Sequence, residues 1–129
     1  MSASARFGAL GALAGFSGVA AGAFGAHALR GTLSPERLQV FETGARYQLV
    51  HALALIAVAI ALRDTRSTPL SVAGWLFVAG QLLFPGSLYA LAFTGVRAWG
   101  AVTPAGGACF LAGWAALGVG LARGRGSGG

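Results

Sequence analysis

Glycine recurs at a regular spacing through the apolar stretch from Phe7 to Leu29. Its six glycines alternate between steps of three and four residues, at Gly8, Gly11, Gly15, Gly18, Gly22 and Gly25. This spacing aligns them in one strip along a helix. In a water-soluble helix each glycine costs roughly 1 kcal/mol relative to alanine, whereas in a bilayer small residues let a second helix approach closely. The stretch therefore predicts a transmembrane helix whose glycine strip packs inside a bundle. We disfavour the alternative, a cleaved secretory signal, because a discarded peptide gains nothing from a packing strip.

The composition is typical of a membrane-embedded chain. Of the 129 residues, 56% are hydrophobic and only 9% are charged, whereas a soluble domain carries about 25% charged residues. There are too few polar groups to cover a globule in water, so we expect the lipid bilayer to surround the chain. The net charge of +6 comes from arginines at the ends of apolar runs, which is typical of helix ends anchored at headgroups. We therefore exclude nucleic acid as a partner.

Four apolar spans predict a single transmembrane domain over residues 1–122. We place the spans at residues 7–29, 47–62, 70–94 and 104–122. The Gly/Ser-rich residues 123–129 are expected to form a disordered tail.

A helix start precedes the second span. Ser34 is a capping residue, Pro35 suits the first helical turn, and Glu36 places a carboxylate at the positive end of the helix dipole. From here to Leu62 there is no strong breaker, and a helix of this length exceeds the hydrocarbon core, which is about 30 Å thick. We therefore expect a short interfacial helix from Pro35 to about Thr43, with a bend near Gly44, between the first and second transmembrane helices.

Small residues recur with a period near 3.5 in all four spans, and in the fourth span they include Gly106, Gly113 and Gly120. This period favours a left-handed bundle with shallow crossings. The expected fold class is therefore an all-α membrane protein, a left-handed bundle of four transmembrane helices. Four spans put both termini on one side of the membrane. Five arginines on that side against four on the other favour the cytoplasm for it.

Polar side chains collect at one end of this expected bundle. Because the helices alternate in direction, the end of the first span, the start of the second and the end of the third should meet there. Ionisable groups at membrane depth are costly and usually face the interior of a bundle. The candidate site comprises His27, Glu42, Arg46, Tyr47, Gln48, His51, Gln81, Ser87 and Tyr89.

The two histidines of this cluster raise the question of a metal or haem site. A neutral imidazole more often bonds a neighbouring carbonyl, and we expect Glu42 to pair with Arg46 four residues further on. The single cysteine, Cys109, forms no internal disulfide and no cysteine-based metal site. We therefore expect no metal and no cofactor. No serine lies in a nucleophile elbow and no glycine-rich loop follows a strand, so we expect no catalytic residues and no enzyme.

Several blocks of sequence resemble one family. They read GAFGAHAL at 22–29, FETGARYQ at 41–48, HALA at 51–54, LFPGSLYAL at 83–91 and TPAGG at 103–107. In this order they resemble the small membrane proteins of domain-of-unknown-function family 423, over nearly the whole chain. The family commonly has serine where this chain has Pro85. The resemblance implies a multi-pass membrane protein, in bacteria one of the inner membrane, and it implies no reaction and no ligand.

Our first hypothesis is a non-enzymatic accessory or scaffold component of the membrane, either a homo-oligomer or part of a larger complex. The alternative is a bundle that binds or transports a small molecule, a lipid or an ion through the polar cluster. A second alternative is metal or haem binding through His27 and His51. A polar cavity that reaches past Gln81 would favour the binding hypothesis, and both histidines within reach of one ion would favour the metal.

Overall fold

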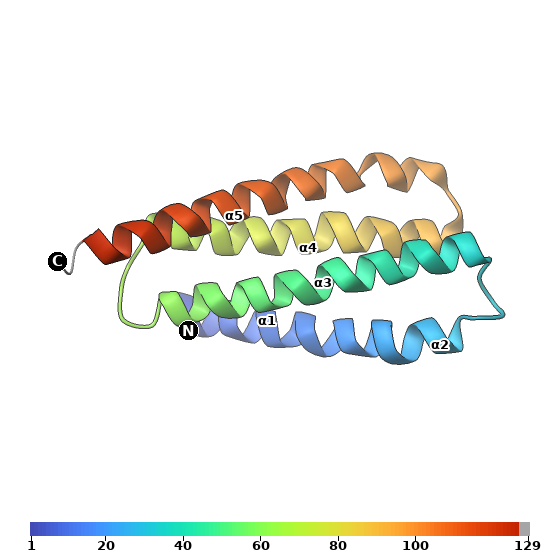
Figure 1. Cartoon of the computed structure of the whole chain (residues 1–129), viewed down its shortest axis with the longest axis horizontal. Helices are drawn as coiled ribbons and strands as arrows, with labels where there is room; N and C mark the ends of the chain where they lie inside the picture. Colours follow the sequence, from blue (N-terminus) through green and yellow to red (C-terminus); the bar gives the residue numbers. More distant parts are fainter. Residues whose placement is uncertain (127–129) are drawn as a thin grey trace.

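The computed structural model of the chain describes residues 1–126, and this part contains helices and short connections but no strands. The first span is α1 (Ala3–Val19), continued by a π-helical segment, η1 (Ala20–Gly25), and one turn, α2 (Ala26–Ala28). It is followed by α3 (Pro35–Ala61) and α4 (Thr68–Thr94). A 3-10 turn, η2 (Arg97–Ala101), then precedes α5 (Thr103–Gly126). The helices run up and down, as Figure 1 shows.

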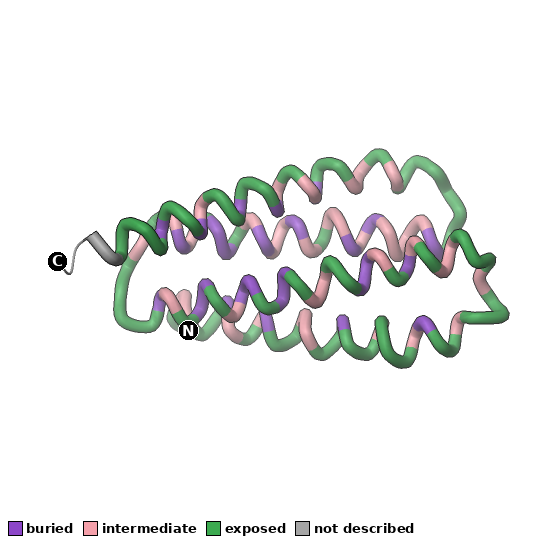
Figure 2. Tube along the Cα trace, in the orientation of Figure 1, coloured by how far each residue is buried: buried purple, intermediate pink, exposed green. Residues whose placement is uncertain are grey.

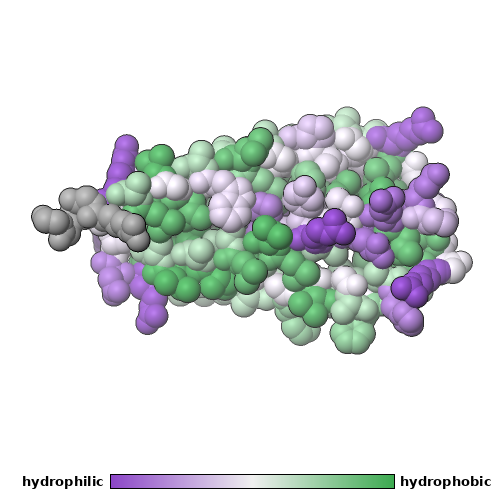
Figure 3. Space-filling view, in the orientation of Figure 1, coloured by the Kyte–Doolittle hydropathy of each residue, from purple (hydrophilic) through white to green (hydrophobic). Residues whose placement is uncertain are grey.

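Within the described residues, four segments are long and apolar enough to cross a membrane. They are Ala3–Ala28, Pro35–Ala61, Thr68–Thr94 and Arg97–Gly124. On the face seen in Figure 3, hydrophilic residues gather mainly at the two ends of the molecule and the middle is largely hydrophobic. The expected all-α fold with four transmembrane helices is confirmed. The left-handed sense of the crossings stays a prediction.

The long helices pack in a row that follows their order in the chain. α1 packs along α3, α3 along α4, and α4 along α5, whereas α1 and α5 do not approach each other within the described residues. The same order is visible across Figure 1. α1 is the least covered of the four spans, and Figure 2 shows mostly exposed residues along it. The row therefore has two edge helices, α1 and α5.

Local signals fix where the helices begin and end. The side chains of Ser2, Ser34 and Ser67 each accept a hydrogen bond from the backbone N–H three residues further on, which caps α1, α3 and α4. Gly95 ends α4 with a φ of +70°, a conformation that glycine adopts without a steric penalty. Arg37 at the start of α3 donates from Nε to the Ala92 carbonyl near the end of α4, over 2.6 Å.

The six glycines of the α1 and η1 strip all lie against α3. A Cβ atom added at any one of them would lie 2.9 to 3.9 Å from the nearest atom of α3, in reverse order along that helix. Gly8 thus lies against Ala59 and Gly25 against Phe41. The absence of side chains lets the two backbones approach, which is the source of close van der Waals packing between helices in lipid.

Aromatic rings fill the notches that glycines leave on the other helices. The pairs are Gly74 with Phe7, Gly80 with Phe110, and Gly113 with Phe77. Two further glycines of α5 pack on α4, where Gly106 meets the backbone at Phe84 and Gly120 meets Leu70. The rings of Phe7, Phe77 and Phe110 join one buried cluster that draws residues from all four helices. The core therefore extends along the row of helices, and its aromatic rings occupy the space beside the glycines.

Three expected boundaries differ from the structure. The short interfacial helix is not a separate element, because α3 continues from Pro35 to Ala61 and Gly44 is buried against the Tyr89 ring at this point. α5 continues to Gly126, so the tail expected from residue 123 starts too early, and residues 127–129 lie outside the described part. The first span also contains the π-helical segment Ala20–Gly25, which the glycine spacing did not reveal.

Candidate functional site

His51, near the middle of α3, is the one ionisable side chain buried within the described residues, with 5% of its surface exposed. Trp114 of α5 lies beside it, with 3.0 Å between the indole Nε1 and the imidazole Nε2. The other ring nitrogen, Nδ1, lies 2.8 Å from the Tyr47 carbonyl oxygen. An indole nitrogen only donates, so Nε2 is the acceptor and Nδ1 carries the proton donated to Tyr47. The imidazole is therefore neutral, and both of its nitrogens are occupied.

Aromatic rings enclose the same imidazole. Phe110 stacks on it with ring centroids 3.5 Å apart and planes inclined by 6°, and Phe77 lies 5.8 Å away. A metal ion or a haem at His51 would have to displace Trp114 or the Tyr47 carbonyl. The arrangement joins α3 to α5 and offers no free lone pair.

His27 lies elsewhere, exposed on α2. The neighbouring Gly25 faces Phe41 of α3, which is ten residues before His51 and therefore about 15 Å from it along the helix. The two histidines do not share a site. Within the described residues, no group of three or more His, Cys, Asp or Glu side chains is placed to hold a metal ion.

Glu42 and Arg46 are both exposed, and no ion pair joins them within residues 1–126. The expected pairing is therefore wrong. Exposed pairs contribute only about 0–1 kcal/mol, which is too little to hold two long side chains in one geometry. Both residues line a shallow groove of about 460 Å³ between the π-helical segment and α3.

A polar network centred on Gln48 joins three helices. The Gln48 Nε2 donates to the Ala14 carbonyl (2.9 Å) and to Ser17 Oγ (2.8 Å), both on α1. Tyr89 of α4 donates its hydroxyl to Gln48 Oε1 over 2.6 Å. Gln81, also on α4, donates from Nε2 to the Gln48 backbone carbonyl over 3.1 Å. The side chain of Gln48 is thus fully bonded between α1 and α4.

A groove of about 290 Å³ opens along this network between α1 and α4. Apolar residues, four of them leucines, form most of its wall, and Ser17, Gln48, Gln81 and Tyr89 are its polar members. The Oε1 atom of Gln81 is buried and has no hydrogen-bond partner. A buried acceptor without a partner costs about 1–3 kcal/mol. A hydrogen-bond donor on a molecule in this groove would therefore be most favourable next to Gln81 Oε1.

The remaining members of the expected cluster lie apart from this groove. Ser87 is buried between α4 and α5, where its Oγ lies 2.6 Å from Thr103 Oγ1. Tyr47 is partly exposed, and its ring packs on Phe84 with centroids 4.5 Å apart. The structure therefore divides the nine candidate residues among several places. Gln48, Gln81 and Tyr89 meet at this groove, Tyr47 lies next to His51, and Glu42 and Arg46 share the shallow groove.

A family model described as "Protein of unknown function (DUF423)" matches residues 21–107. The match covers more than half of the chain, from the π-helical segment to the first turns of α5. The chain belongs to this family. The resemblance drawn from the sequence blocks is confirmed.

Known proteins similar to this DUF423 chain are named as membrane proteins. A UPF0382 membrane protein of Haemophilus influenzae is 49% identical over 112 residues, which cover 84% of this chain and 87% of that protein. A UPF0382 membrane protein of Staphylococcus haemolyticus is 46% identical over 108 residues, 84% of this chain and 88% of the relative. The UPF0382 inner membrane protein YgdD of Escherichia coli K12 is 43% identical over 112 residues, 87% and 86% of the two chains. No solved structure matches.

This DUF423 protein is therefore an integral membrane protein of an uncharacterised family. Two residues of its interior were missed at the level of sequence, Trp114 as the partner of His51 and Ser17 as the partner of Gln48. Ser17 carried a signal, because it is the only hydroxyl within an apolar first span. Trp114 carried none, because its position in the fourth span does not reveal which helix it faces.

Proposed function

We propose that this protein is a non-enzymatic scaffold component of the bacterial inner membrane that associates with a second copy of itself along α5. The observation that carries the proposal is the row of helices, in which no other part of residues 1–126 covers the outer sides of α1 and α5. Helices in lipid gain stability from packing against other helices. An edge helix whose outer face suits such packing is therefore the place for a partner.

The interior supports a role without catalysis. His51 is a side chain suited to general acid–base chemistry, and both of its nitrogens are hydrogen-bonded among aromatic rings. The polar network at Gln48 consists of amides and hydroxyls, which do not ionise near neutral pH and are poor general acids or bases. These groups hold helices together.

The outer face of α5 favours a second copy over other occupants. Opposite the glycines that face α4, this helix exposes a line of alanines at steps of three and four residues: Ala105, Ala108, Ala112 and Ala115, with Ala122 further on. A second copy inserted in the same orientation presents the same line, so a two-fold axis along the membrane normal makes the contact self-complementary. The α1 edge also exposes alanines at this spacing, Ala5, Ala9 and Ala12, but the exposed Phe16 interrupts that line, whereas the line on α5 runs from Ala105 to Ala115.

Cysteine cross-linking in native membranes tests this proposal. In a Cys109→Ser background, we expect Ala108→Cys, Ala112→Cys and Ala115→Cys to form disulfide-linked dimers on mild oxidation. Leu53→Cys is the matched control, because Leu53 is 71% exposed on α3, away from the proposed contact. Cross-linking at Leu53 as efficient as at Ala112, or at none of the positions, would overturn the proposal.

We further propose that both termini lie in the cytoplasm. In the sequence, five of the nine arginines belong to the side where the chain begins and ends and four to the other side, and arginine is enriched on the cytoplasmic side. The five are Arg6, Arg63, Arg66, Arg123 and Arg125. A C-terminal alkaline phosphatase fusion should be inactive and a C-terminal fluorescent protein fusion should be bright. The reverse pattern would place both ends outside.

A second candidate function is binding of a lipid-soluble molecule in the groove between α1 and α4. The buried, unpartnered Oε1 of Gln81 supports it, because a hydroxyl donor on an otherwise apolar ligand would supply the missing bond. We expect 1-hexadecanol to raise the thermal midpoint of the detergent-solubilised protein in a saturable way, and its methyl ether to have no effect. Equal shifts from both compounds, or from wild type and Gln81→Leu, would remove this candidate.

A further inference from the structure

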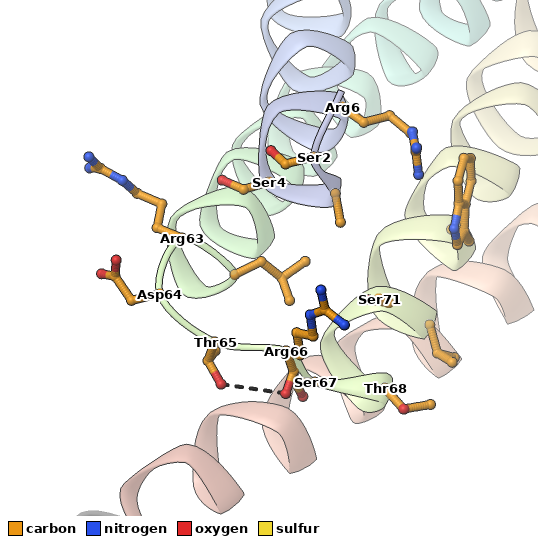
Figure 4. A pocket seen from close by; sticks show the side chains of 14 residues that line it. Ser2, Ser4, Arg6, Arg63, Asp64, Thr65, Arg66, Ser67, Thr68 and Ser71 are labelled. Atoms are coloured by element: carbon orange, nitrogen blue, oxygen red, sulfur yellow. Dashed lines mark hydrogen bonds between the residues drawn. The ribbon is translucent and has the colours of Figure 1, made fainter.

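An open pocket of about 980 Å³ lies at the end of the molecule where α1 and α4 begin. Figure 4 shows its walls, which are the first turns of α1, the connection between α3 and α4, and the first turns of α4. The pocket is distinct from the groove at Gln48, which lies further along the helices and shares no lining residue with it. Its position at the end of the apolar spans corresponds to the headgroup region of a bilayer.

The pocket has more positive than negative charge. Three arginines and one carboxylate line it: Arg6, Arg63, Arg66 and Asp64. In Figure 4, Arg66 turns toward the interior and Arg6 extends from α1 toward α4, whereas Arg63 and Asp64 point outward. No ion pair involves any of the four within the described residues. Two guanidinium groups therefore face the pocket without a counter-charge.

Backbone and hydroxyl groups add to this preference for an anion. Ser2 and Ser67, the capping residues of α1 and α4, both line the pocket, so the positive ends of two helix dipoles lie at its wall. The hydroxyls of Thr68 and Ser71 line it too and have no hydrogen-bond partner within residues 1–126. Arginine, hydroxyl and helix-terminus groups are the donors that phosphate oxygens accept from.

One wall of the pocket is apolar. Val72 and Trp75 of α4 line it and are 45% and 49% exposed, on the surface that continues toward the hydrophobic middle of the molecule. The Arg6 guanidinium lies over the Trp75 ring, 5.7 Å from its centroid, so the charged and apolar parts meet there. A soluble anion would use only the charged part, whereas a phospholipid would use both.

We propose that this pocket binds the phosphate of an anionic phospholipid headgroup. Arg6 and Arg66 supply the counter-charges, the hydroxyls of Thr68 and Ser71 donate to the phosphate oxygens, and Trp75 packs beside the first carbons of an acyl chain. The proposal does not depend on the contact along α5, because none of these residues belongs to that helix.

Native mass spectrometry of the purified full chain tests the site. The probes are phosphatidylglycerol and phosphatidylcholine with identical acyl chains, added in equal amounts. We expect the wild type to retain phosphatidylglycerol about tenfold more than phosphatidylcholine. The double variant Arg6→Gln/Arg66→Gln should lose this preference and retain the two lipids equally.

The matched control is Arg30→Gln/Arg97→Gln, which removes the same charge from two exposed side chains at the opposite end of the molecule. It should keep the tenfold preference, and millimolar inorganic phosphate should not displace the bound lipid. Equal losses in the two double variants would show attraction by net charge only. Displacement by inorganic phosphate would show a site for a free anion, and no preference in the wild type would show no site. Each of these results overturns the proposal. All four arginines are exposed, and thermal midpoints near that of wild type would verify that both variants are folded.

Discussion

The indole of Trp114 and the imidazole of His51 are joined by a hydrogen bond of 3.0 Å between α5 and α3, two helices that otherwise touch only locally. The bond links α3 directly to α5, although α4 stands between these two helices in the row. It fixes the tautomer of His51 and uses the one nitrogen that would otherwise be free. His51, a candidate metal ligand in the sequence, therefore has a structural role between the helices.

Replacing Trp114 by phenylalanine tests this role. The variant leaves His51 Nε2 buried without a donor, which costs about 1–3 kcal/mol in a protein interior, and interhelical bonds in membranes are at the lower end of that range. We expect a loss of about 1 kcal/mol in the free energy of unfolding, measured by reversible unfolding in mixed detergent micelles. Trp99→Phe is the control, because the Trp99 side chain makes no hydrogen bond in the described part of the chain. Equal losses in the two variants would mean that the bond contributes nothing.

Two glycines of the same helix provide a test of the packing. At Gly113 an added Cβ would lie 2.7 Å from the Phe77 ring, whereas at Gly118 it would meet nothing within 4 Å. Gly118→Ala should stabilise the helix by up to about 1 kcal/mol. Gly113→Ala should destabilise the protein by about 1–3 kcal/mol, because the ring must move. If thermal unfolding in detergent gave both variants the same midpoint, α5 would not pack on α4 through Gly113.

The Gln48 network predicts unequal effects of removing two tyrosine hydroxyls. Tyr89→Phe deletes the donor to Gln48 Oε1, so we expect a loss of about 0.6–1.7 kcal/mol in the free energy of unfolding. Tyr47→Phe should leave stability unchanged, because the Tyr47 hydroxyl has no partner within residues 1–126. Unfolding curves of the two variants in the same micelles provide the comparison, and a larger effect at Tyr47 would contradict the network.

Much of the fold follows from the sequence for physical reasons. Hydropathy and helix length locate the spans, and the serine caps locate three helix starts. The spacing of the glycines from Gly8 to Gly25 identifies the face of the first span that packs on another helix. It does not say which helix that is. It also does not reveal the π-helical segment, because a shift of the backbone hydrogen bonds from i→i+4 to i→i+5 requires no particular residue type.

The site was harder to predict, because its contacts depend on the order of the helices in space. An up-and-down bundle of four can close into a square or stay open as a row, and the same period near 3.5 suits both. His27 and His51 are expected at one end only if the second span starts near Tyr47, whereas α3 starts at Pro35 and places His51 further into the bundle. Trp114 reaches His51, and Ser17 reaches Gln48, through the particular row that forms.

The mass of the protein released from the membrane is the most direct test of whether two copies associate along α5. Native mass spectrometry of the protein ejected from lipid nanodiscs should give twice the 12.8 kDa of one chain for the wild type. Ala112→Leu, which places a large side chain on the outer face of α5, should give the mass of one chain with an unchanged helical spectrum. A single chain for the wild type, or a dimer that persists in Ala112→Leu, would contradict association along α5.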